Sequence, residues 1–464
     1  MKQVGGFRTT RKIVTALVDV LLFFVSFYIS FFVRYGRTFP VENFQSFTQS
    51  FWYIILFFLA LNILSGVYVY YNKSVGDLLF ITIIDQFFLS LFIMVLTFAG
   101  RWLAFPRSVI LLNLIFSIIL LFLWRYAVFE FYRRFSGSKK IMVIGKQEKV
   151  FAAIDNFKSS KSVRHIVTHV ALDRYLENVQ EYLKDVDIVY IASQINQDER
   201  IEICEYVMRN NKKVFLNTSF DNLLLVNPNL MNIEDESIME LSGFEIPQEI
   251  EMMKRIADIL ISLVLLVITS PIMLVAAILV KRSSEGPIFY RQTRVTKGGL
   301  DFEILKFRSM GVTAEQESGP VLATSNDVRV TPVGKYLRAL RIDELPQLIN
   351  VLKGDMSLVG PRPERPFFVE QFKEENPYYY LRHNVRAGIT GYAQVYGKYA
   401  SNFNSKLNFD LIYIKKYSLV LDIKIMLQTV KILFDKVSSQ GLEEGEQHIY
   451  TERELEESGI SVLR

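Results

Sequence analysis

Cysteine and histidine are scarce in this sequence. Its 464 residues include one cysteine, Cys204, and four histidines. A single cysteine excludes an intrachain disulfide and a cysteine-cluster metal site, and the scattered histidines disfavour a histidine-based one. The formal net charge of +5 is too small to indicate a nucleic-acid partner. Any chemistry must therefore rest on carboxylate, lysine and arginine side chains.

Apolar residues are plentiful. Half of the chain is hydrophobic, with 37 Phe and 23 Tyr, and only 22% is charged. This composition excludes a disordered or collagen-like chain. The length predicts about three structural units. A mean hydropathy of +0.22 predicts that one of them is embedded in lipid.

Four apolar runs in residues 1–135 are long enough to cross a bilayer, which takes about 20 residues. Basic residues precede the first run and follow the fourth, so the positive-inside rule places both ends of this region in the cytoplasm. We therefore expect a bundle of four transmembrane helices. The runs are Ile13–Val33, Phe51–Tyr71, Leu78–Gly100 and Ser108–Trp124.

Two alternatives concern these runs. A cleaved signal peptide is disfavoured for the first run, because that run contains Asp19 and lacks a small-residue cleavage pattern. Asp19, Asn62 and Asp85 are polar groups within the runs, and such groups often line a conduction path. With only three of them and no visible inverted repeat, we expect them to pack between helices instead.

Residues 139–240 alternate between strand-like and helix-like segments, which predicts a small parallel-sheet domain of Rossmann-like type. Gly145 follows the first predicted strand but is not part of a G-x-G-x-x-G fingerprint, so the domain is expected to be degenerate and without a dinucleotide. Asp185 and Asp187 form a D-x-D pair that is common by chance. We interpret His165 and His169 as structural.

A fifth apolar run, Ile256–Val280, has basic residues at both ends. A simple crossing would place those ends on opposite sides of the membrane, against the positive-inside rule. Ser270-Pro271 lies in mid-run, and proline removes a backbone hydrogen bond and kinks a helix. We therefore expect residues 254–281 to form a re-entrant helix broken at Ser270 and Pro271, with a simple crossing as the alternative.

Residues 282–435 form a polar, amphipathic block, expected to be a mainly α-helical domain on the cytoplasmic side. Residues 281–310, at the start of this block, are rich in basic side chains. This favours binding to an anionic membrane surface or to a polyphosphate ligand. The tail, residues 436–464, carries seven Glu and is expected to be solvated or partly helical.

Asp343 and Glu344 stand at a predicted helix start, where Asp343 can cap and Gly354 closes the helix. The helix dipole would keep both carboxylates ionised, as suits a nucleophile or a ligand of a hard metal. Arg362 follows between two prolines, and Arg386 precedes Gly388 and Gly391, whose exposed amides could approach phosphate oxygens. Ionised carboxylates with converging arginines are typical of phosphoryl transfer.

Five motifs in order resemble the bacterial sugar transferases, the polyprenyl-phosphate glycosyl-1-phosphate transferases also called monotopic phosphoglycosyl transferases. The four preceding helices and the α/β domain resemble the long form of that family. The motifs are GPIFYRQTRV (286–295), FEILKFRSM (302–310), RIDELPQLINVLKGDMSLVGPRPE (341–364), RAGITGYAQV (386–395) and YSLVLDIKIMLQTV (417–430). The chain departs from the pattern at Ala387, where proline commonly follows the arginine.

The resemblance implies transfer of a sugar-1-phosphate from a UDP-sugar, such as a UDP-hexose, to undecaprenyl phosphate. UMP is released, and the product initiates a capsule, exopolysaccharide or O-antigen repeat unit. Asp343 matches the nucleophile, and Glu344, with Asp343, matches the Mg²⁺ site. The positions that match phosphate or uridine contacts are Lys306, Arg308, Arg338, Arg362, Arg386 and Asp422.

The sequence therefore predicts a multi-pass enzyme of the bacterial cytoplasmic membrane, with its catalytic domain on the cytoplasmic face. The expected partners are the UDP-sugar, undecaprenyl phosphate and the lipid bilayer, with a homodimer and capsule-assembly proteins as further candidates and no nucleic acid. Two other classes stay open. The α/β domain could make the chain a nucleotide-sugar oxidoreductase or epimerase, or the chain could be a transporter or a non-catalytic scaffold.

Overall fold

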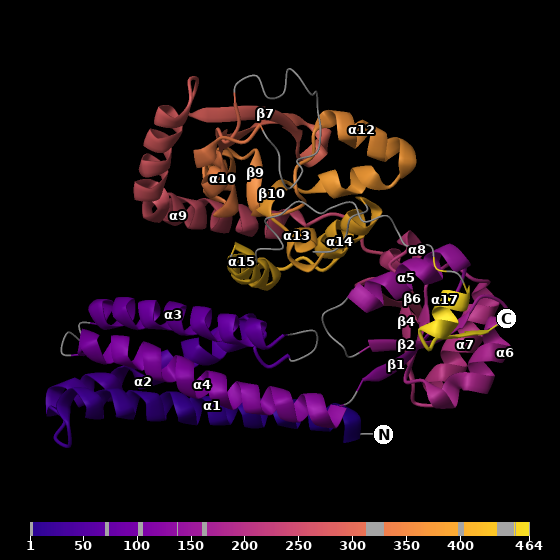
Figure 1. Cartoon of the computed structure of the whole chain (residues 1–464), viewed down its shortest axis with the longest axis horizontal. Coiled ribbons are helices and arrows are strands. Elements are labelled where there is room, and N and C mark those ends of the chain that lie inside the picture. The colour runs from indigo at the N-terminus through magenta and orange to yellow at the C-terminus, as the bar shows by residue number, and fades with distance from the viewer. Residues whose placement is uncertain are drawn as a thin grey trace. The chain divides into compact units, whose positions relative to one another are not determined.

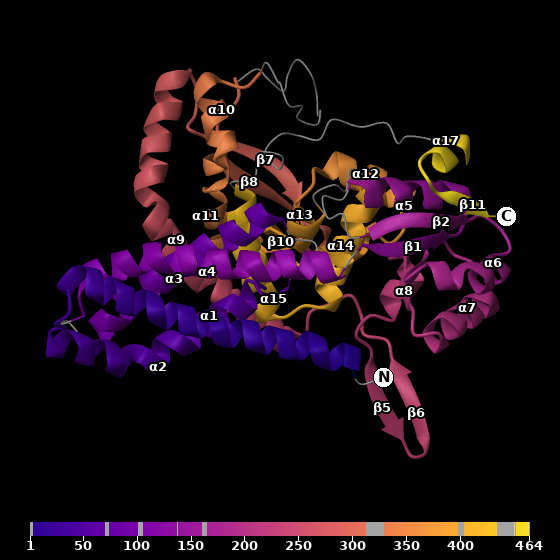
Figure 2. The ribbon, with the colours of Figure 1, turned by 60° about the horizontal axis from the view of Figure 1, so that its bottom comes forward.

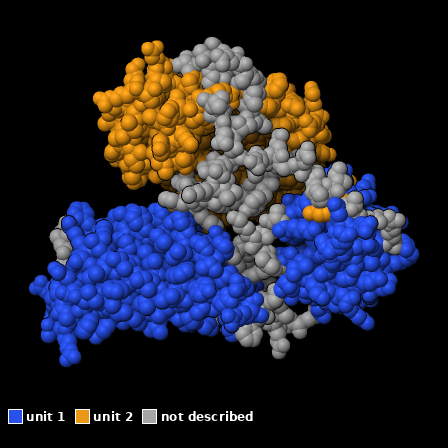
Figure 3. Space-filling model, viewed as in Figure 1, with its two compact units in different colours: residues 1–190, 195–214, 451–464 blue, residues 191–194, 215–450 orange. Residues whose placement is uncertain are grey.

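The computed structural model describes most of the chain. The described residues are 3–69, 74–100, 105–136, 138–159, 165–311, 329–397, 403–433, 450 and 452–463. Two compact units are distinguished in Figure 3. Unit 1 comprises Met1–Tyr190, Ile195–Val214 and Thr451–Arg464, and unit 2 comprises Ile191–Gln194 and Phe215–Tyr450.

The N-terminal part of unit 1 consists of long apolar helices. Helix α1 packs against α4, α4 against α3, and α3 against α2. All four, together with α9 of unit 2 (Gln248–Ser283), are long and apolar enough to cross a membrane. The chain thus has the features of a membrane protein. The four helices are α1 (Gln3–Tyr35), α2 (Val41–Leu64), α3 (Val75–Ala99) and α4 (Arg107–Ser136).

Helix α2 differs most from its predicted run. The run Phe51–Tyr71 was expected, but α2 begins ten residues earlier, directly after Pro40, and ends at Leu64. Proline fixes an extended entry into the helix, and Gly66 then adopts a positive φ of 68°, which a helix interior does not tolerate. The last two residues of the predicted run lie outside the described residues.

The polar groups of the first three helices converge on one arginine. Arg125 Nη2 donates to Asp19 Oδ2 at 2.8 Å and also to Asn62, and Arg125 Nη1 donates to Thr82 Oγ1 at 3.0 Å. The side chains of Arg125 and Asp19 are fully buried. The expected packing role of Asp19 and Asn62 is confirmed. Arg125 is the first of the basic residues that follow the fourth predicted run, where a charge on the cytoplasmic flank was expected. Instead it joins four helices internally, because three polar partners on its neighbours replace water.

A five-stranded sheet follows, in the order β11-β2-β1-β3-β4. Strand β1 pairs in parallel with β2, and β2 pairs in parallel with β11. Helices surround this sheet in Figure 1. Its elements are β1 (Lys139–Ile144), α5 (Gln147–Ser159), β2 (His165–Ala171), α6 (Tyr175–Tyr182), η1 (Leu183–Asp185), β3 (Ile188–Ile191), α7 (Gln197–Arg209), β4 (Lys213–Leu216), α17 (Glu452–Glu457) and β11 (Ser461–Leu463).

The end of the acidic tail contributes to this sheet. The expected partial helix is present as α17, but β11 was not expected, since the tail shows no alternating apolar pattern. Leu455 and Ile460 are buried and hold the segment against the domain. An edge strand is stabilised by backbone hydrogen bonds to the neighbouring strand. The local sequence of the tail does not indicate that such a partner exists. Residues 434–449 of the tail lie outside the described residues.

Unit 2 contains one main apolar core. The core includes Leu223, Val351, Met356, Leu411 and Ile425. Its elements are α8 (Phe220–Leu224), β5 (Asn229–Ile233), β6 (Glu236–Glu240), α9, β7 (Phe289–Val295), η2 (Lys297–Gly299), β8 (Asp301–Phe307), α10 (Pro332–Ala339), η3 (Ile342–Glu344), α11 (Gln347–Lys353), β9 (Met356–Val359), α12 (Pro366–Glu375), η4 (Tyr379–Asn384), β10 (Ala387–Thr390), α13 (Tyr392–Tyr396), α14 (Phe403–Lys415) and α15 (Leu419–Leu433).

The boundary between the units differs from the expected one at 240. Residues from Phe215 onward group with unit 2, because Leu223 of α8 is part of its core and Lys415 Nζ donates to the Leu224 carbonyl at 3.2 Å. Strands β5 and β6 form an antiparallel hairpin, which Figure 2 shows as a separate ribbon. The alternation of strands and helices in the sequence does not indicate that α8 packs in the core of unit 2.

Both ends of α9 pack on the rest of unit 2, whereas many apolar side chains between them are exposed. Arg255 near the first end donates to the Leu352 carbonyl at 2.9 Å. Ala276 and Val280 near the other end are buried against Phe307 and Leu337. Between them, large apolar side chains such as Val267, Ile268 and Leu274 are more than 60% exposed. Such an apolar stretch is suited to lipid rather than water.

Helix α9 changes direction sharply along its length (Figure 1), and Pro271 lies inside it. Proline has no N–H to donate to the carbonyl four residues earlier, which belongs to Val267. The Ser270 hydroxyl donates to that carbonyl at 2.8 Å. The expected break at Ser270 and Pro271 is wrong, because α9 stays helical from Gln248 to Ser283. The Ser-Pro pair bends the helix instead, and the serine satisfies the carbonyl that the proline leaves unpaired, as a low-dielectric environment requires.

Candidate active site

Asp343 and Glu344 lie in the short 3₁₀ turn η3. Arg341 precedes the turn in a left-handed conformation with φ 56°. The prediction that Asp343 caps the next helix is wrong: α11 begins at Gln347 with Pro346 at the cap position, and no side-chain cap is formed. Gly354 does close α11, with φ 101°. The carboxylates thus lie before the first turn of α11, and their charges depend on burial and on neighbouring charged groups rather than on the helix dipole.

Glu344 is surrounded by three cationic side chains. Lys306 Nζ and Arg362 Nη2 each lie 3.4 Å from Glu344 Oε1, and Arg341 Nη1 lies 3.7 Å from Oε2. Burial alone would raise the pKa of Glu344, but these cations outweigh it and lower the pKa to about 2. Glu344 is therefore a permanent anion at neutral pH.

Asp343 has a different environment. It is 8% exposed, and no hydrogen bond or ion pair from a described residue reaches its carboxylate. Burial raises the pKa of Asp343 and the charge of Glu344 raises it further, to about 6, against the opposing effect of Lys306 and Arg338. Asp343 is therefore the more basic of the two carboxylates, and at pH 7 it is ionised without being bound by a cation.

The cations come from three separate elements. Lys306 lies on β8, opposite Tyr290 in the β7–β8 hairpin. Arg362 follows β9 in a loop, and Arg338 lies in the last turn of α10. Burial lowers the pKa of Lys306, although Glu344 opposes the shift. The structure thus brings together three of the six predicted binding residues. Lys306 and Arg362 contact Glu344 directly. Arg338 makes no such contact, but its charge lowers the pKa of Asp343.

The other three predicted binding residues are engaged elsewhere. Arg308 Nη2 donates to the Ser284 carbonyl at 2.7 Å, just beyond the end of α9. Arg386 Nη1 lies 2.7 Å from Glu251 Oε1, near the start of α9. Asp422 Oδ2 lies 2.6 Å from Lys254 Nζ, and Asp422 Oδ1 accepts from Tyr413 at 2.8 Å. In this structure these three side chains hold α9 on unit 2 and do not contact the carboxylate pair.

Gly388 and Gly391 do not offer exposed amides, so that expectation is wrong. Both are buried, and Gly388 N donates to the Pro361 carbonyl at 2.9 Å. A Cβ at Gly388 would lie 2.1 Å from Gly360 N, and one at Gly391 would lie 2.2 Å from Gly360 O. These glycines allow β10 to approach the backbone that leads to Arg362.

Sequence reasoning missed Arg341, Arg294 and Arg382. Arg341 contacts Glu344 directly, and its position three residues before Glu344 is a signal that could have identified it. Arg294 Nη1 donates to the Pro363 carbonyl at 3.1 Å, and Arg382 Nη2 donates to the Arg362 carbonyl at 2.8 Å. Neither bond has a local sequence signature.

The donor set fits a divalent cation that is shared with a substrate. Among the described residues no group of three or more His, Cys, Asp or Glu could hold a metal. Mg²⁺, however, is commonly held by one or two carboxylates together with substrate phosphates. Asp343 and Glu344 supply that number of carboxylates, and the adjacent cations suit a ligand with several negative charges.

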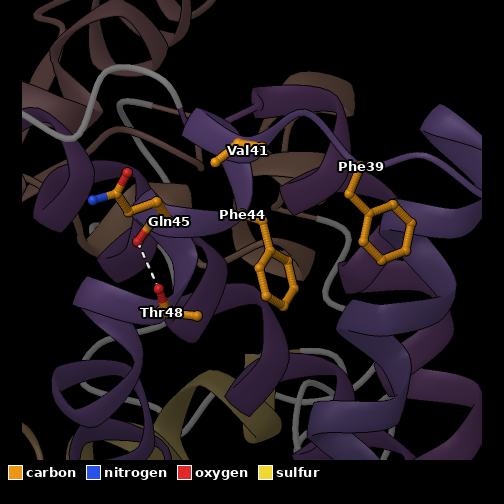
Figure 4. A pocket seen from close by; sticks show the side chains of 5 residues that line it. All are labelled: Phe39, Val41, Phe44, Gln45 and Thr48. Carbon is orange, nitrogen blue, oxygen red and sulfur yellow. Dashed lines mark hydrogen bonds between the residues drawn. The ribbon is translucent and has the colours of Figure 1, made fainter.

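A separate hollow on unit 1 lacks this chemistry. Figure 4 shows the side chains that line it, Phe39, Val41, Phe44, Gln45 and Thr48. The volume of the hollow is about 430 Å³. The Thr48 hydroxyl donates to the Gln45 carbonyl at 2.9 Å, and no charged side chain lines the hollow. It is therefore not a candidate for phosphoryl transfer.

A family model described as bacterial sugar transferase matches residues 249–436, which contain the carboxylate pair and every cation around it. The chain belongs to this family. Relatives support the assignment. A UDP-N-acetylgalactosamine-undecaprenyl-phosphate N-acetylgalactosaminephosphotransferase of Aeromonas hydrophila is 50% identical over 183 residues, 39% of this chain and 43% of that protein.

Two further relatives bear the name UDP-glucose:undecaprenyl-phosphate glucose-1-phosphate transferase. The Escherichia coli K12 protein is 35% identical over 271 residues, 54% of this chain and 57% of its own. The Caulobacter vibrioides protein is 42% identical over 191 residues, 40% of this chain and 70% of its own. The chain spans about half the length of several of these relatives.

The glycine packing near Arg362 leads to a first prediction. Gly388→Ala should lower the thermal midpoint of the full-length chain, because the new Cβ cannot fit beside Gly360 N and overpacking costs about 1–3 kcal/mol. Gly243→Ala is the matched control, since nothing lies within 4 Å of its Cβ position. The midpoints are measured by differential scanning fluorimetry in detergent. Equal midpoints for the two variants would contradict the close packing of Gly388 against Gly360.

Proposed function

We propose that this protein transfers a sugar-1-phosphate from a UDP-sugar to undecaprenyl phosphate with release of UMP. The observation that carries the proposal is the pair Asp343–Glu344, in which one carboxylate is bound by cations and the other is not. The names of the relatives, which specify UDP-sugars and undecaprenyl phosphate, support the choice of substrates. A UDP-hexose is the proposed donor, and synthesis of a surface polysaccharide repeat unit is the proposed context.

Asp343 is the proposed nucleophile. Its carboxylate oxygen attacks the β-phosphorus of the UDP-sugar, the bond from that phosphorus to the bridging oxygen breaks, and UMP leaves. A phosphate oxygen of undecaprenyl phosphate then attacks the resulting sugar-phosphoryl aspartate, which releases undecaprenyl-diphospho-sugar and restores the Asp343 carboxylate. Dividing the transfer into two steps lets a water-soluble and a lipid substrate use one site in turn.

The cations have distinct proposed roles. Lys306 and Arg362, both at 3.4 Å from Glu344, lie where they can also contact diphosphate oxygens. Arg338 favours the ionised form of Asp343. Glu344, with Asp343, is the proposed Mg²⁺ site, and the ion would supply neutralisation of the diphosphate charge. Arg308, Arg386 and Asp422 are proposed to act by holding α9 rather than by contacting the substrate.

The proposed membrane arrangement follows from α9. Both ends of α9 pack on unit 2, so a helix that enters the bilayer and returns keeps unit 2 on one side. We propose that α1–α4 form a transmembrane bundle, that the five-stranded domain is Rossmann-like, and that the carboxylate pair faces the cytoplasm at the bacterial inner membrane. A homodimer and contacts with polysaccharide-assembly proteins remain predictions from the family resemblance.

The proposed activity can be measured by UMP release. Full-length protein supplied with Mg²⁺, undecaprenyl phosphate and a panel that includes UDP-glucose and UDP-N-acetylgalactosamine should release UMP from at least one donor. Asp343→Asn should reduce the rate about a thousandfold or more, because the amide oxygen is a poor nucleophile. Asp301→Asn, at an exposed position on β8, should stay within about twofold of wild type. Full activity of Asp343→Asn would exclude its role as nucleophile.

The raised pKa of Asp343 predicts the pH dependence of the first step. The protonated carboxyl cannot attack, so UMP release without the lipid acceptor should fall as the pH drops through about 6 and approach a tenfold loss per further pH unit. Single-turnover rates between about pH 5 and pH 8 measure this limb. A rate that stays constant down to pH 5 would contradict an unprotonated Asp343 as the attacking group.

The re-entrant arrangement predicts the side on which unit 2 lies. With Cys204 replaced by Ser, the chain has no other cysteine, and Glu370→Cys adds one at an exposed position of α12, after α9 in the chain. This thiol should be protected from an impermeant maleimide in intact cells. Thr38→Cys, exposed between α1 and α2, should be labelled from outside. Labelling at position 370 in intact cells would mean that α9 crosses the bilayer.

A further inference from the structure

The loop that carries Arg362 is held at every peptide carbonyl from Pro361 to Glu364. The Pro361 carbonyl accepts from Gly388 N at 2.9 Å, and the Glu364 carbonyl accepts from Val295 N at 3.0 Å. The two carbonyls between them accept from arginine side chains: Arg382 binds Arg362 O at 2.8 Å, and Arg294 binds Pro363 O at 3.1 Å. We call residues 361–364 the Arg362 loop.

Arg382 is itself fixed on all sides. Its Nε and Nη2 lie 3.0 and 2.9 Å from Asp410 Oδ2 on α14, and its Nη1 donates to the Tyr379 hydroxyl at 2.7 Å. Arg382 is 5% exposed, and Asp410 and Tyr379 are each 2% exposed. All three guanidinium nitrogens are therefore occupied, and the bond to the Arg362 carbonyl is part of one rigid assembly.

This assembly does not touch the carboxylate pair directly. Within the described residues, no hydrogen bond or ion pair joins Arg382 or Asp410 to Asp343 or Glu344, whereas Arg362 Nη2 lies 3.4 Å from Glu344 Oε1. Pro361 and Pro363 limit the backbone freedom on either side of Arg362. Because the carbonyl of Arg362 is also hydrogen-bonded, the backbone position from which the Arg362 side chain extends is fixed.

A buried ion pair is not needed for stability alone, because apolar residues of similar volume often replace such pairs without loss of folding. The pair Arg382–Asp410 does what apolar residues cannot do: it donates a hydrogen bond to the Arg362 carbonyl. We propose that Arg382, oriented by Asp410, is a positioning residue of the transfer reaction, which acts through Arg362. This inference rests on the proposed function, in which Arg362 contacts the substrate diphosphate.

The test uses the full-length chain with both charges removed together, Arg382→Met with Asp410→Leu, since either single change would leave a buried charge unpaired. The rate of UMP release should fall about 10- to 100-fold while the thermal midpoint is kept, as expected when a reacting group is displaced by about 1 Å. Lys415→Met is the control and should keep the wild-type rate, because Lys415 also donates to carbonyls, those of Leu224 and Ser242, but not to the Arg362 loop.

A coupling measurement separates positioning from general destabilisation. If Arg382 acts through Arg362, then adding the pair substitution to Arg362→Met should lower the rate by no more than about threefold beyond Arg362→Met alone. Full multiplication of the two losses would overturn the proposal. An unchanged rate in the pair variant would overturn it as well.

A structural measurement keeps the test independent of the assay. A cryo-EM structure of the pair variant should show the Arg362 loop displaced and the Arg362 guanidinium moved away from Glu344. An unmoved loop would overturn the positioning role whatever the activity. Failure of the wild-type protein to release UMP from any donor would count against the proposed function instead, and the displacement of the loop would still decide the role of Arg382.

Discussion

Two neighbouring carboxylates in a partly dry site repel one another, and both resist burial as anions. In the structure the two carboxylates have different environments. Glu344 is paired with Lys306, Arg341 and Arg362 and stays charged. Asp343 forms no ion pair with these cations, and its pKa is the higher of the two. Much of unit 2 supports this difference, because Lys306 and Arg362 come from elements 38 and 18 residues away from Glu344 in the sequence.

The placement depends on backbone packing as much as on charge. Gly360, Gly388 and Gly391 let two stretches of backbone approach more closely than any Cβ permits. The strand pair β9–β10 then delivers the Arg362 loop beside η3. Buried arginines hold the loop by its carbonyls, so several cations that would be costly to bury alone are each satisfied by carboxylates or carbonyl oxygens.

Helix α9 obeys a related rule in an apolar setting. Its exposed middle is largely apolar, so the bend at Pro271 is accompanied by the Ser270 hydroxyl bond to the Val267 carbonyl. The polar side chains sit at its ends, where Lys254 meets Asp422 and Arg386 meets Glu251. In unit 1, Arg125 follows the same principle by gathering the polar groups of neighbouring helices.

The sequence by itself determined the apolar helices, the strand and helix alternation after residue 139, the irregularity at the Ser-Pro pair and the adjacent carboxylates, because each depends on local periodicity or on a short motif. Only the tertiary structure decided which cations contact Glu344. It also showed that Arg308, Arg386 and Asp422 contact the ends of α9. It also added β11 to a sheet formed almost 300 residues earlier, opposite β2. The physical reason is range: Lys306 and Glu344, or Arg382 and Asp410, meet across 38 and 28 residues. No local pattern of polarity specifies which of many similar charges will be paired when the core closes.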